Sequence, residues 1–235
     1  MVYNWLNITR NWLFPASCRL CAAATHHELS ICHHCYRELP WLPPGCTTCA
    51  TPQPTAGNLT QCEACLRLSP DLDRVLALFE YRAPVDQWVR GLKFHGDLTL
   101  AKLLGQLLAE HAPERQNVLL VPVPLHRHRL RQRGFNQALE IARPLRRRGY
   151  RIDAHCCSRK RHTPPQSELP AKARLHNLHD AFEVRHSVKG NNIVLIDDVF
   201  TTGSTLNSLA ASLKEAGAVK VEAWVIARTA GPGTR

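Results

Sequence analysis

Residues 193–205 of the chain read Ile193-Val194-Leu195-Ile196-Asp197-Asp198-Val199-Phe200-Thr201-Thr202-Gly203-Ser204-Thr205. The four apolar residues at the start predict a buried strand of a parallel sheet, and two carboxylates mark its end. Small and hydroxyl-bearing residues then predict a short loop, after which the apolar pattern favours a helix over 204–216, closed by Gly217. The stretch therefore indicates a strand–loop–helix corner of an α/β domain.

Such a corner presents a helix N-terminus and free backbone N–H groups, which attract a phosphate group. Gly203 lets the backbone approach a ligand closely. Further donors are the hydroxyls of Thr201, Thr202, Ser204 and Thr205. Acids repel phosphate, so Asp197 and Asp198 suggest a second part of the ligand, and vicinal ribose hydroxyls are good donors to two carboxylates. The stretch lacks the GxxxxGK[ST] motif of a Walker A loop, so it is not a nucleoside-triphosphate loop of that kind. The hydroxyl-rich loop and the acid pair together predict a site for a phosphorylated ribose. The alternative is a capped turn with incidental acids.

The chain on either side of this corner alternates strand-like and helix-like patterns from about residue 70 onward, as α/β domains do. We expect strands over Val75–Tyr81, Val118–Val123, Ile193–Ile196 and Val219–Ala227. We expect helices over 85–94, 98–111 and about 136–147. Pro144 lies inside the third of these helices and is expected to kink or shorten it.

Eight of the ten cysteines stand as four CxxC pairs near the N-terminus. The pairs are Cys18/Cys21, Cys32/Cys35, Cys46/Cys49 and Cys62/Cys65. Two residues between thiolates let both sulfurs reach one tetrahedral ion, so the pairs predict one or two structural zinc sites. Disulfides, a redox motif and an iron–sulfur cluster are the alternatives, and the spacing leaves open which pairs share an ion. Cys156 and Cys157 are expected to be apolar filler.

The formal net charge of +11 is concentrated in one segment. Residues 126–174 hold 14 Lys and Arg against 3 Asp and Glu, which accounts for the whole excess. A localised positive field indicates a polyanionic partner, either a diphosphate or a nucleic acid.

Several stretches resemble the ComF family, which joins a Cys-rich zinc module to a type I phosphoribosyltransferase domain. The acidic loop is similar to the signature by which those enzymes bind phosphoribosyl pyrophosphate (PRPP). Further matches lie at Gly91–Asp97, Val121–Arg127, Arg133–Gln137 and 163–177, so that the resemblance spans nearly all of residues 12–227.

The resemblance implies an α/β fold with a mostly parallel, twisted sheet, and PRPP with Mg²⁺ at its C-terminal edge. Asp197 and Asp198 are then the expected catalytic and ribose-binding acids. Arg127 and Arg133 are expected to hold the pyrophosphate, because Arg binds phosphate oxygens in a bidentate way, and Lys93 is a further candidate. A long polar connection suggests a lid over the ligand. Its expected contact residues are Arg161, Thr163 and Gln166.

We expect two parts, a zinc module over 1–67 and a phosphoribosyltransferase-type domain over 68–235. The first 18 residues lack the basic start and unbroken apolar run of an export signal, which favours the cytoplasm, and no transmembrane segment is expected. The family's link to DNA uptake leaves two alternatives open. One is a nucleic-acid-binding protein, with single-stranded DNA as partner and PRPP binding regulatory or vestigial. The other is a scaffold that docks a DNA-uptake helicase through an apolar face made of Trp5, Trp12, Leu13, Phe14 and Trp41. The interpretation that we favour for these five side chains is packing of the zinc module against the main domain. The acceptor of a transfer reaction and the oligomeric state stay open.

Overall fold

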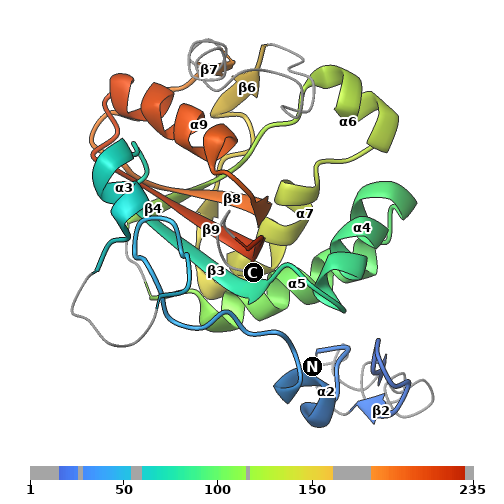
Figure 1. Cartoon of the computed structure of the whole chain (residues 1–235). Helices are drawn as coiled ribbons and strands as arrows, with labels where there is room; N and C mark the ends of the chain where they lie inside the picture. The colour runs from blue at the N-terminus through green and yellow to red at the C-terminus, as the bar shows by residue number, and fades with distance from the viewer. Residues whose placement is uncertain (1–15, 26–28, 54–59, 115–116, 161–180, 231–235) are drawn as a thin grey trace. The chain divides into compact units, whose positions relative to one another are not determined.

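The computed structural model describes residues 16–25, 29–53, 60–114, 117–160 and 181–230 (Figure 1). Backbone contacts divide the chain into two compact units, Met1–Pro40 and Trp41–Arg235. The smaller unit holds the first two Cys pairs, the short strands β1 (Ala16–Ser17) and β2 (Ala24–Thr25), and helix α2 (His33–Arg37). The larger unit holds the last two Cys pairs together with the whole α/β domain.

A five-stranded parallel sheet forms the centre of the larger unit. Its order is β3 (Arg74–Glu80), β9 (Lys220–Arg228), β8 (Asn192–Phe200), β4 (Val118–Pro122) and β5 (Arg151–Ile152). The inner strands β8 and β9 are almost wholly buried, which explains their continuous apolar runs. The expected fold class, a mostly parallel α/β sheet with a Cys-rich N-terminal part, is confirmed.

Helices cover both faces of the sheet. Helix α9 (Ser204–Glu215) packs on one face through Leu206, Leu209 and Leu213, against Leu195 and Val221 of the sheet. Figure 1 shows α5 (Leu98–His111) and α7 (Gln137–Ala142) on the opposite side from α9. Helix α4 (Val85–His95) precedes α5 and ends at Gly96, whose φ of 66° suits a glycine.

Two parts of the domain differ from the sequence-based expectation. The helix expected over about 136–147 breaks into α7 and a 3₁₀ helix, η1 (Arg143–Arg148), because Pro144 cannot continue an α-helix. Helix α6 (Arg127–Arg133) and strands β6 (Cys157–Arg159) and β7 (Phe182–Val184) were not expected. Helix α6 buries none of its residues, so it has no apolar period to reveal it.

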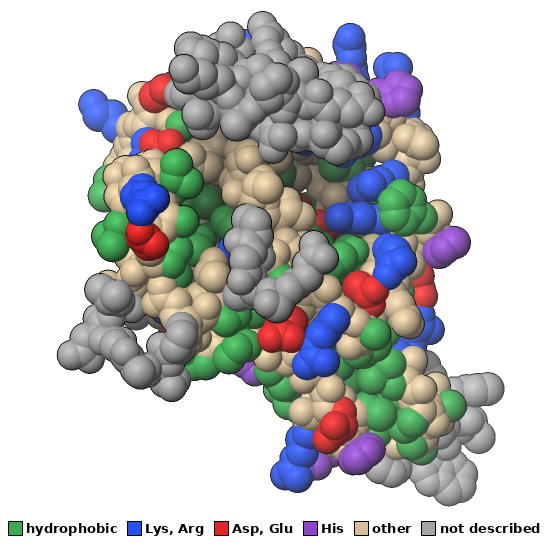
Figure 2. Space-filling model, viewed as in Figure 1, with side chains coloured by type: hydrophobic (Ala, Val, Ile, Leu, Met, Phe, Trp, Pro, Cys, Tyr) green, Lys and Arg blue, Asp and Glu red, His purple; other side chains and the backbone are tan. Residues whose placement is uncertain are grey.

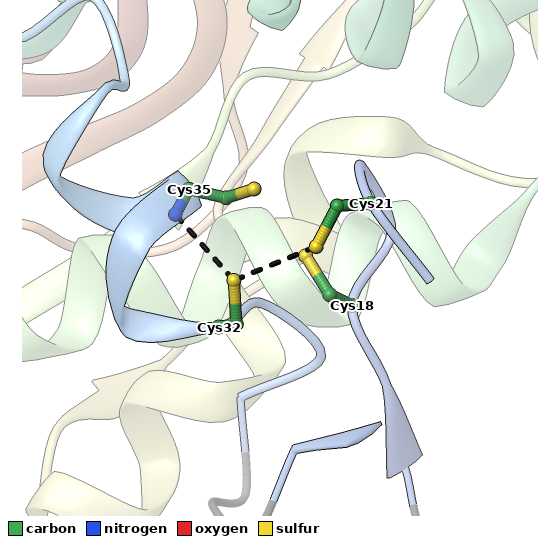
Figure 3. Close-up of side chains that lie close together, drawn as sticks. All are labelled: Cys18, Cys21, Cys32 and Cys35. Atoms are coloured by element: carbon green, nitrogen blue, oxygen red, sulfur yellow. Dashed lines mark hydrogen bonds between the residues drawn. The ribbon is translucent and has the colours of Figure 1, made fainter. Parts of the chain in front are cut away.

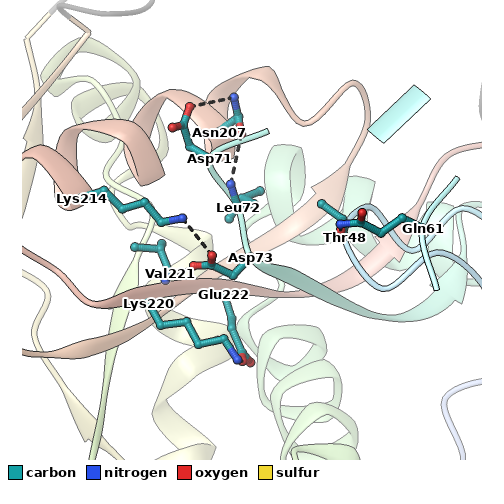
Figure 4. A network of polar contacts seen from close by, with 10 residues as sticks. All are labelled: Thr48, Gln61, Asp71, Leu72, Asp73, Asn207, Lys214, Lys220, Val221 and Glu222. Atoms are coloured by element: carbon teal, nitrogen blue, oxygen red, sulfur yellow. Dashed lines mark hydrogen bonds and ion pairs between the residues drawn. The ribbon is translucent and has the colours of Figure 1, made fainter. Parts of the chain in front are cut away.

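A network of polar contacts fixes the start of β3 against α9 and β9 (Figure 4). Asp73 accepts hydrogen bonds from Lys214 Nζ at 2.9 Å and from the Val221 backbone N–H at 2.7 Å. Asn207 of α9 accepts from the Leu72 backbone N–H at 3.2 Å and donates to Asp71 at 3.4 Å. These bonds join the two ends of the domain sequence and hold α9, whose first residue follows the acidic loop.

The second Cys-rich loop, which carries the pairs Cys46/Cys49 and Cys62/Cys65, is attached to the same sheet. Arg228 at the end of β9 donates from Nε to the Cys49 carbonyl at 2.7 Å and from Nη2 to Thr51 Oγ1 at 2.5 Å. The Val75 backbone N–H of β3 donates to the Thr47 carbonyl at 3.0 Å. Helix α3 (Glu63–Leu68) carries Cys65 and leads toward β3. This Cys-rich loop is therefore part of the α/β unit.

None of the helices in the described parts combines the length and the apolarity that a bilayer crossing requires.

Candidate functional site

The acid pair lies within β8, near its carboxyl end and beside the end of β4. The strand was expected to end at Ile196, before the acids, but it runs on to Phe200 because these residues continue to pair with β9. Ile196 of β8 is in register with Pro122 of β4, and the Val123 backbone N–H donates to the Ile196 carbonyl at 3.0 Å. Asn136 at the start of α7 donates from Nδ2 to the Val123 carbonyl at 3.0 Å. The loop that follows β4 and the acids that follow Ile196 therefore emerge at the same edge of the sheet.

Asp198 is a buried carboxylate with one oxygen paired and one open. Lys93 of α4 places Nζ 2.9 Å from Asp198 Oδ1. Asp198 is 3% exposed, and its Oδ2 is buried without a hydrogen-bond partner in the part of the chain that the structure describes. A buried carboxylate oxygen without a donor is costly, so this atom is suited to a hydroxyl group of a ligand.

Asp197 has an unusual affinity for a proton. Burial, followed by the charge of Asp198, raises the pKa of Asp197 to about 7, while the positive charges of Lys93 and Arg159 oppose the shift. Asp197 Oδ1 accepts a hydrogen bond from the Asp198 backbone N–H at 2.9 Å. Two acids this close cannot both be ionised without cost, so Asp197 titrates near neutral pH.

The loop after β8 has the form that the sequence predicted. Gly203 has a φ of 75°, and a Cβ at this position would lie 2.4 Å from the ring of Phe200. Thr202 Oγ1 lies 2.7 Å from Ser204 Oγ and accepts from the Ser204 backbone N–H at 3.4 Å. Thr201 and Thr202 are exposed and Ser204 and Thr205 are half-buried, so all four hydroxyls lie at or near the surface where α9 begins.

Basic side chains lie around the acids to different extents. Burial lowers the pKa of Arg133, and the negative charges of Asp198 and Asp197 oppose this shift. Arg133 is therefore close enough to both acids for an electrostatic interaction. Burial also lowers the pKa of Arg159, and the negative charge of Asp197 opposes this shift. Arg127 is exposed on α6, and among the described residues no ion pair joins it to the acids. Figure 2 shows Lys, Arg and His side chains gathered around α6.

Sequence reasoning missed one of these neighbours, Arg159, and did not predict the partner of Lys93. Lys93 was expected beside a pyrophosphate, yet it is paired with Asp198. Arg159 was not singled out, and its position in the short strand β6 gives no pattern by which to find it. The expected lid residues Arg161, Thr163 and Gln166 lie outside the described residues, between β6 and β7. Cys156 and Cys157 are buried in the core beside β6, as expected of apolar filler.

The eight paired cysteines form two groups, and in each the sulfurs lie within 4.8 Å of one another. Cys18, Cys21, Cys32 and Cys35 form the first group, shown in Figure 3, and Cys46, Cys49, Cys62 and Cys65 form the second. Cys21 and Cys32 sulfurs are 3.6 Å apart, and Cys49 and Cys62 sulfurs are 3.7 Å apart. A zinc–sulfur bond of about 2.3 Å gives a tetrahedron with an edge of about 3.8 Å, so both groups fit Zn²⁺. Consecutive pairs share a site, which resolves the pairing that the sequence left open.

Backbone N–H groups also point at these sulfurs. The Cys35 N–H donates to Cys32 Sγ at 3.5 Å, as Figure 3 shows, and the Cys62 N–H donates to Cys46 Sγ at 3.3 Å. Such bonds stabilise negative charge on sulfur, as a zinc ligand requires. His33 and His34 are exposed and belong to neither group.

Comparison with known proteins gives matches over both parts of the chain. A double zinc ribbon domain family matches residues 9–66, and the phosphoribosyl transferase domain family matches residues 141–233. The chain is 33% identical to the DNA utilization protein YhgH of Salmonella typhimurium over 221 residues, covering 90% of this chain and 95% of the relative. It is 32% identical to competence protein F of Haemophilus influenzae, covering 84% of each chain.

Solved structures give partial likenesses. An adenine phosphoribosyltransferase from Thermoanaerobacter pseudethanolicus aligns with a TM-score of 0.37 at 16% identity, over 57% of this chain and 83% of that chain. A purine phosphoribosyltransferase from Pyrococcus horikoshii aligns with a TM-score of 0.30 at 16% identity, over 67% and 89%.

Proposed function

The chain belongs to the family of YhgH DNA utilization proteins and ComF competence proteins, and on that premise we propose that its acidic loop binds PRPP as the magnesium complex. The 5′-phosphate is held by the backbone and hydroxyls of residues 201–205, and the ribose hydroxyls donate to Asp197 and Asp198. The pyrophosphate faces the basic side chains of α6, with Arg133 and Arg127 as its partners.

One observation carries this proposal. Asp198 Oδ2 is buried and has no donor among the described residues, and Asp198 lies two residues before the end of β8. A ribose hydroxyl supplies the missing hydrogen bond. A phosphate group is a poorer partner, because its oxygens chiefly accept and its negative charge is repelled by the carboxylate. The site is therefore suited to a sugar phosphate better than to phosphate alone.

The chemistry of PRPP defines the reaction of the proposed transferase. The bond between C1 of the ribose and the pyrophosphate oxygen breaks, and its electron pair leaves with pyrophosphate. A nucleophile forms the new bond to C1 and loses its proton to solvent or to a nearby base. Mg²⁺, which arrives with PRPP, and the arginines stabilise the negative charge on the leaving group. The acids balance the positive charge that develops on the sugar.

We further propose that the two Cys groups hold structural Zn²⁺ and that the whole protein serves the use of DNA in the cytoplasm. The relatives are named for DNA utilization and competence. Arg133 and Arg159 lie near the acids, whereas Arg146, Arg147 and Arg148 are exposed on η1. The positive charge of residues 126–174 is thus divided between arginines that lie near the acids and arginines that are exposed on η1. Among the described residues, no feature favours direct DNA binding or a scaffold role over PRPP binding.

Titration calorimetry with PRPP and Mg²⁺ tests the proposal. Asp198→Asn keeps the size of the side chain and removes its charge, and we expect its affinity for PRPP to fall at least about 30-fold, since a charged hydrogen bond contributes about 2 kcal/mol. Asp86→Asn on α4 removes a carboxylate away from the site and is the matched control. Unchanged affinity in Asp198→Asn would refute the proposal. A screen of nucleobases for pyrophosphate release then tests whether transfer takes place.

A further inference from the structure

Arg228 is a buried cation whose hydrogen-bond partners carry no charge. It is the last residue of β9 and is 7% exposed. Its guanidinium donates to the Cys49 carbonyl at 2.7 Å, to the Thr229 carbonyl at 2.6 Å and to Thr51 Oγ1 at 2.5 Å, and no carboxylate of the described residues pairs with it. A buried charge needs compensation, so the counter-charge of Arg228 has to come from another group.

The second Cys group, made of Cys46, Cys49, Cys62 and Cys65, can supply that charge. Four thiolates carry more negative charge than one Zn²⁺ neutralises, so the loaded group is an anion. Thr51 Oγ1 lies 2.9 Å from Cys49 Sγ. Because this hydroxyl oxygen accepts from Arg228, its own proton is available for a hydrogen bond to the sulfur. Arg228 is thus one hydroxyl away from a metal ligand, and such partners orient the ligands of a metal site.

The same guanidinium contacts a ring that supports the loop after β8. Arg228 and Phe200 are in register at the ends of β9 and β8, and the guanidinium lies 5.3 Å from the centroid of the Phe200 ring, within the range of a cation–π contact. Phe200 is 5% exposed, and its ring lies so close to the Gly203 backbone that an added Cβ would be 2.4 Å away. The position of this ring therefore affects the position of Gly203, from which the loop passes into α9.

We propose that Arg228 is a positioning residue of the phosphate loop, residues 201–205, that it acts through Phe200, and that the metal-loaded second Cys group holds it in place. This inference rests on the proposed function and adds a regulation of the same site. Loss of the metal removes the anion beside Thr51, so the guanidinium is held less firmly and the Phe200 ring is free to turn away from Gly203. The loop should then bind a phosphate group more weakly, although Arg228 touches no part of the ligand.

Coupling between two sites is reciprocal, so the affinity of the second Cys group for its metal should respond to a ligand in the loop. Cys21→Ser disables the first Cys group and leaves the second one to be measured. Competition with a chromophoric chelator gives the Zn²⁺ affinity of this protein with and without saturating ribose 5-phosphate. We expect ribose 5-phosphate to raise that affinity about 5- to 150-fold, the usual range for coupled sites, and Arg228→Met in the same background should reduce the factor to near 1.

Calorimetry with ribose 5-phosphate measures the coupling from the other end. Thr51→Val removes the hydroxyl between Cys49 and Arg228 and should weaken binding at least about 5-fold, whereas Thr51→Ser keeps the hydroxyl and should retain the wild-type affinity. Thr47→Val is the control, because it removes a hydroxyl of the same Cys-rich loop that is bonded to the Thr60 carbonyl. The variants of Thr51 leave the buried guanidinium in place, so this test holds even where Arg228→Met does not fold.

The outcomes separate the coupling from the proposed function. A Zn²⁺ affinity that is unchanged by bound ribose 5-phosphate overturns the coupling and leaves the proposed function intact. A factor that persists in Arg228→Met, or a Thr51→Val protein that binds like Thr51→Ser, overturns the role of Arg228. Failure of the wild-type protein to bind ribose 5-phosphate at all contradicts the proposed function, and the coupling with it.

Discussion

Lys93 Nζ lies 2.9 Å from Asp198 Oδ1, so helix α4 places a cation against the buried acid of β8. The side chains of Lys93 and Asp198 are 22% and 5% exposed. Removing one member of a buried pair leaves the other charged and without compensation, which costs more than the pair itself contributes. Lys93 therefore lies in an ion pair with Asp198 and is a positioning residue for the proposed site.

A double-mutant cycle tests this relationship. Lys93→Met should reduce the free energy of unfolding by about 2 kcal/mol, below the range for a fully buried pair because Lys93 retains some solvent. Adding Asp198→Asn should restore part of the loss, since no unpaired charge then remains, and the coupling should be about 1–2 kcal/mol. Urea unfolding provides the measurement. Lys102→Met on the exposed side of α5 is the control, and additive losses would show that the pair is not coupled.

The pKa of Asp197 predicts how stability depends on pH. Burial and the charge of Asp198 raise this pKa from 3.8 to about 7 in the folded protein. The folded state thus binds more protons than the unfolded state between pH 4 and pH 7, and the contribution of Asp197 to stability is lost as the pH rises through 7. Asp197→Asn carries no ionisable group, so it should be more stable than wild type at pH 8.5 by roughly 2–4 kcal/mol.

The comparison with Asp197→Asn is made by urea unfolding at pH 5.5 and pH 8.5, without PRPP or Mg²⁺. The advantage of the variant should shrink at pH 5.5, because the wild-type carboxyl is then mostly protonated. Asp86→Asn on α4 should show no such pH-dependent advantage. An Asp197→Asn protein whose stability relative to wild type is the same at both values would contradict the raised pKa.

Local sequence patterns predicted the helices and strands whose apolar residues recur at a regular spacing. Helix α5 has the bounds that its apolar spacing indicated, Leu98–His111, and β4 ends one residue before the expected Val123. The Cys pairs were identified as metal ligands by spacing alone. Helix α6 escaped prediction because its sequence is nearly all polar, and β5, β6 and β7 are two or three residues long. Such short segments carry too few residues to show alternation.

The contacts of the site could not be read from the sequence. Lys93 and Asp198 are far apart along the chain, and their contact depends on how α4 lies relative to β8. The same holds for Arg159, which β6 brings toward Asp197. The sharing of ions by consecutive Cys pairs depends on the path of the backbone between them. Sequence patterns therefore predicted which residues are candidates for the site, and the packing of the helices and strands decided their partners.

Gly203 is the loop residue for which a side chain should be most harmful. Its φ of 75° disfavours any L-residue, and an added Cβ would lie 2.4 Å from the Phe200 ring. Phe200 is buried and contacts Arg228, whose guanidinium lies 5.3 Å from the ring centroid, so the ring cannot move freely. We expect Gly203→Ala to cost about 1 kcal/mol from the backbone and a further 1–3 kcal/mol from overpacking.

Gly190→Ala separates these two contributions. Gly190 has a φ of 77° and no atom within 4 Å of an added Cβ, so it carries the backbone cost alone. Urea unfolding of both variants should show the larger loss for Gly203→Ala, and PRPP affinity should fall in that variant only. Equal losses in stability would mean that Phe200 yields without cost.

Loss of metal from the first Cys group and from the second should affect the stability of the protein differently. The second group lies in a loop that is bonded to the sheet through Arg228 and the Cys49 carbonyl and through Val75 and the Thr47 carbonyl. The first group belongs to the unit Met1–Pro40, which clusters apart from the α/β domain.

Cys49→Ser and Cys21→Ser should each reduce bound zinc from about two ions per chain to about one, because three thiolates hold the metal poorly. Scanning calorimetry should show a fall of roughly 10 °C in the main transition for Cys49→Ser, corresponding to about 3 kcal/mol, and little change for Cys21→Ser. Equal shifts in the two variants would contradict the assignment of the second zinc loop to the α/β unit, because metal loss at either site would then act on the same cooperative structure.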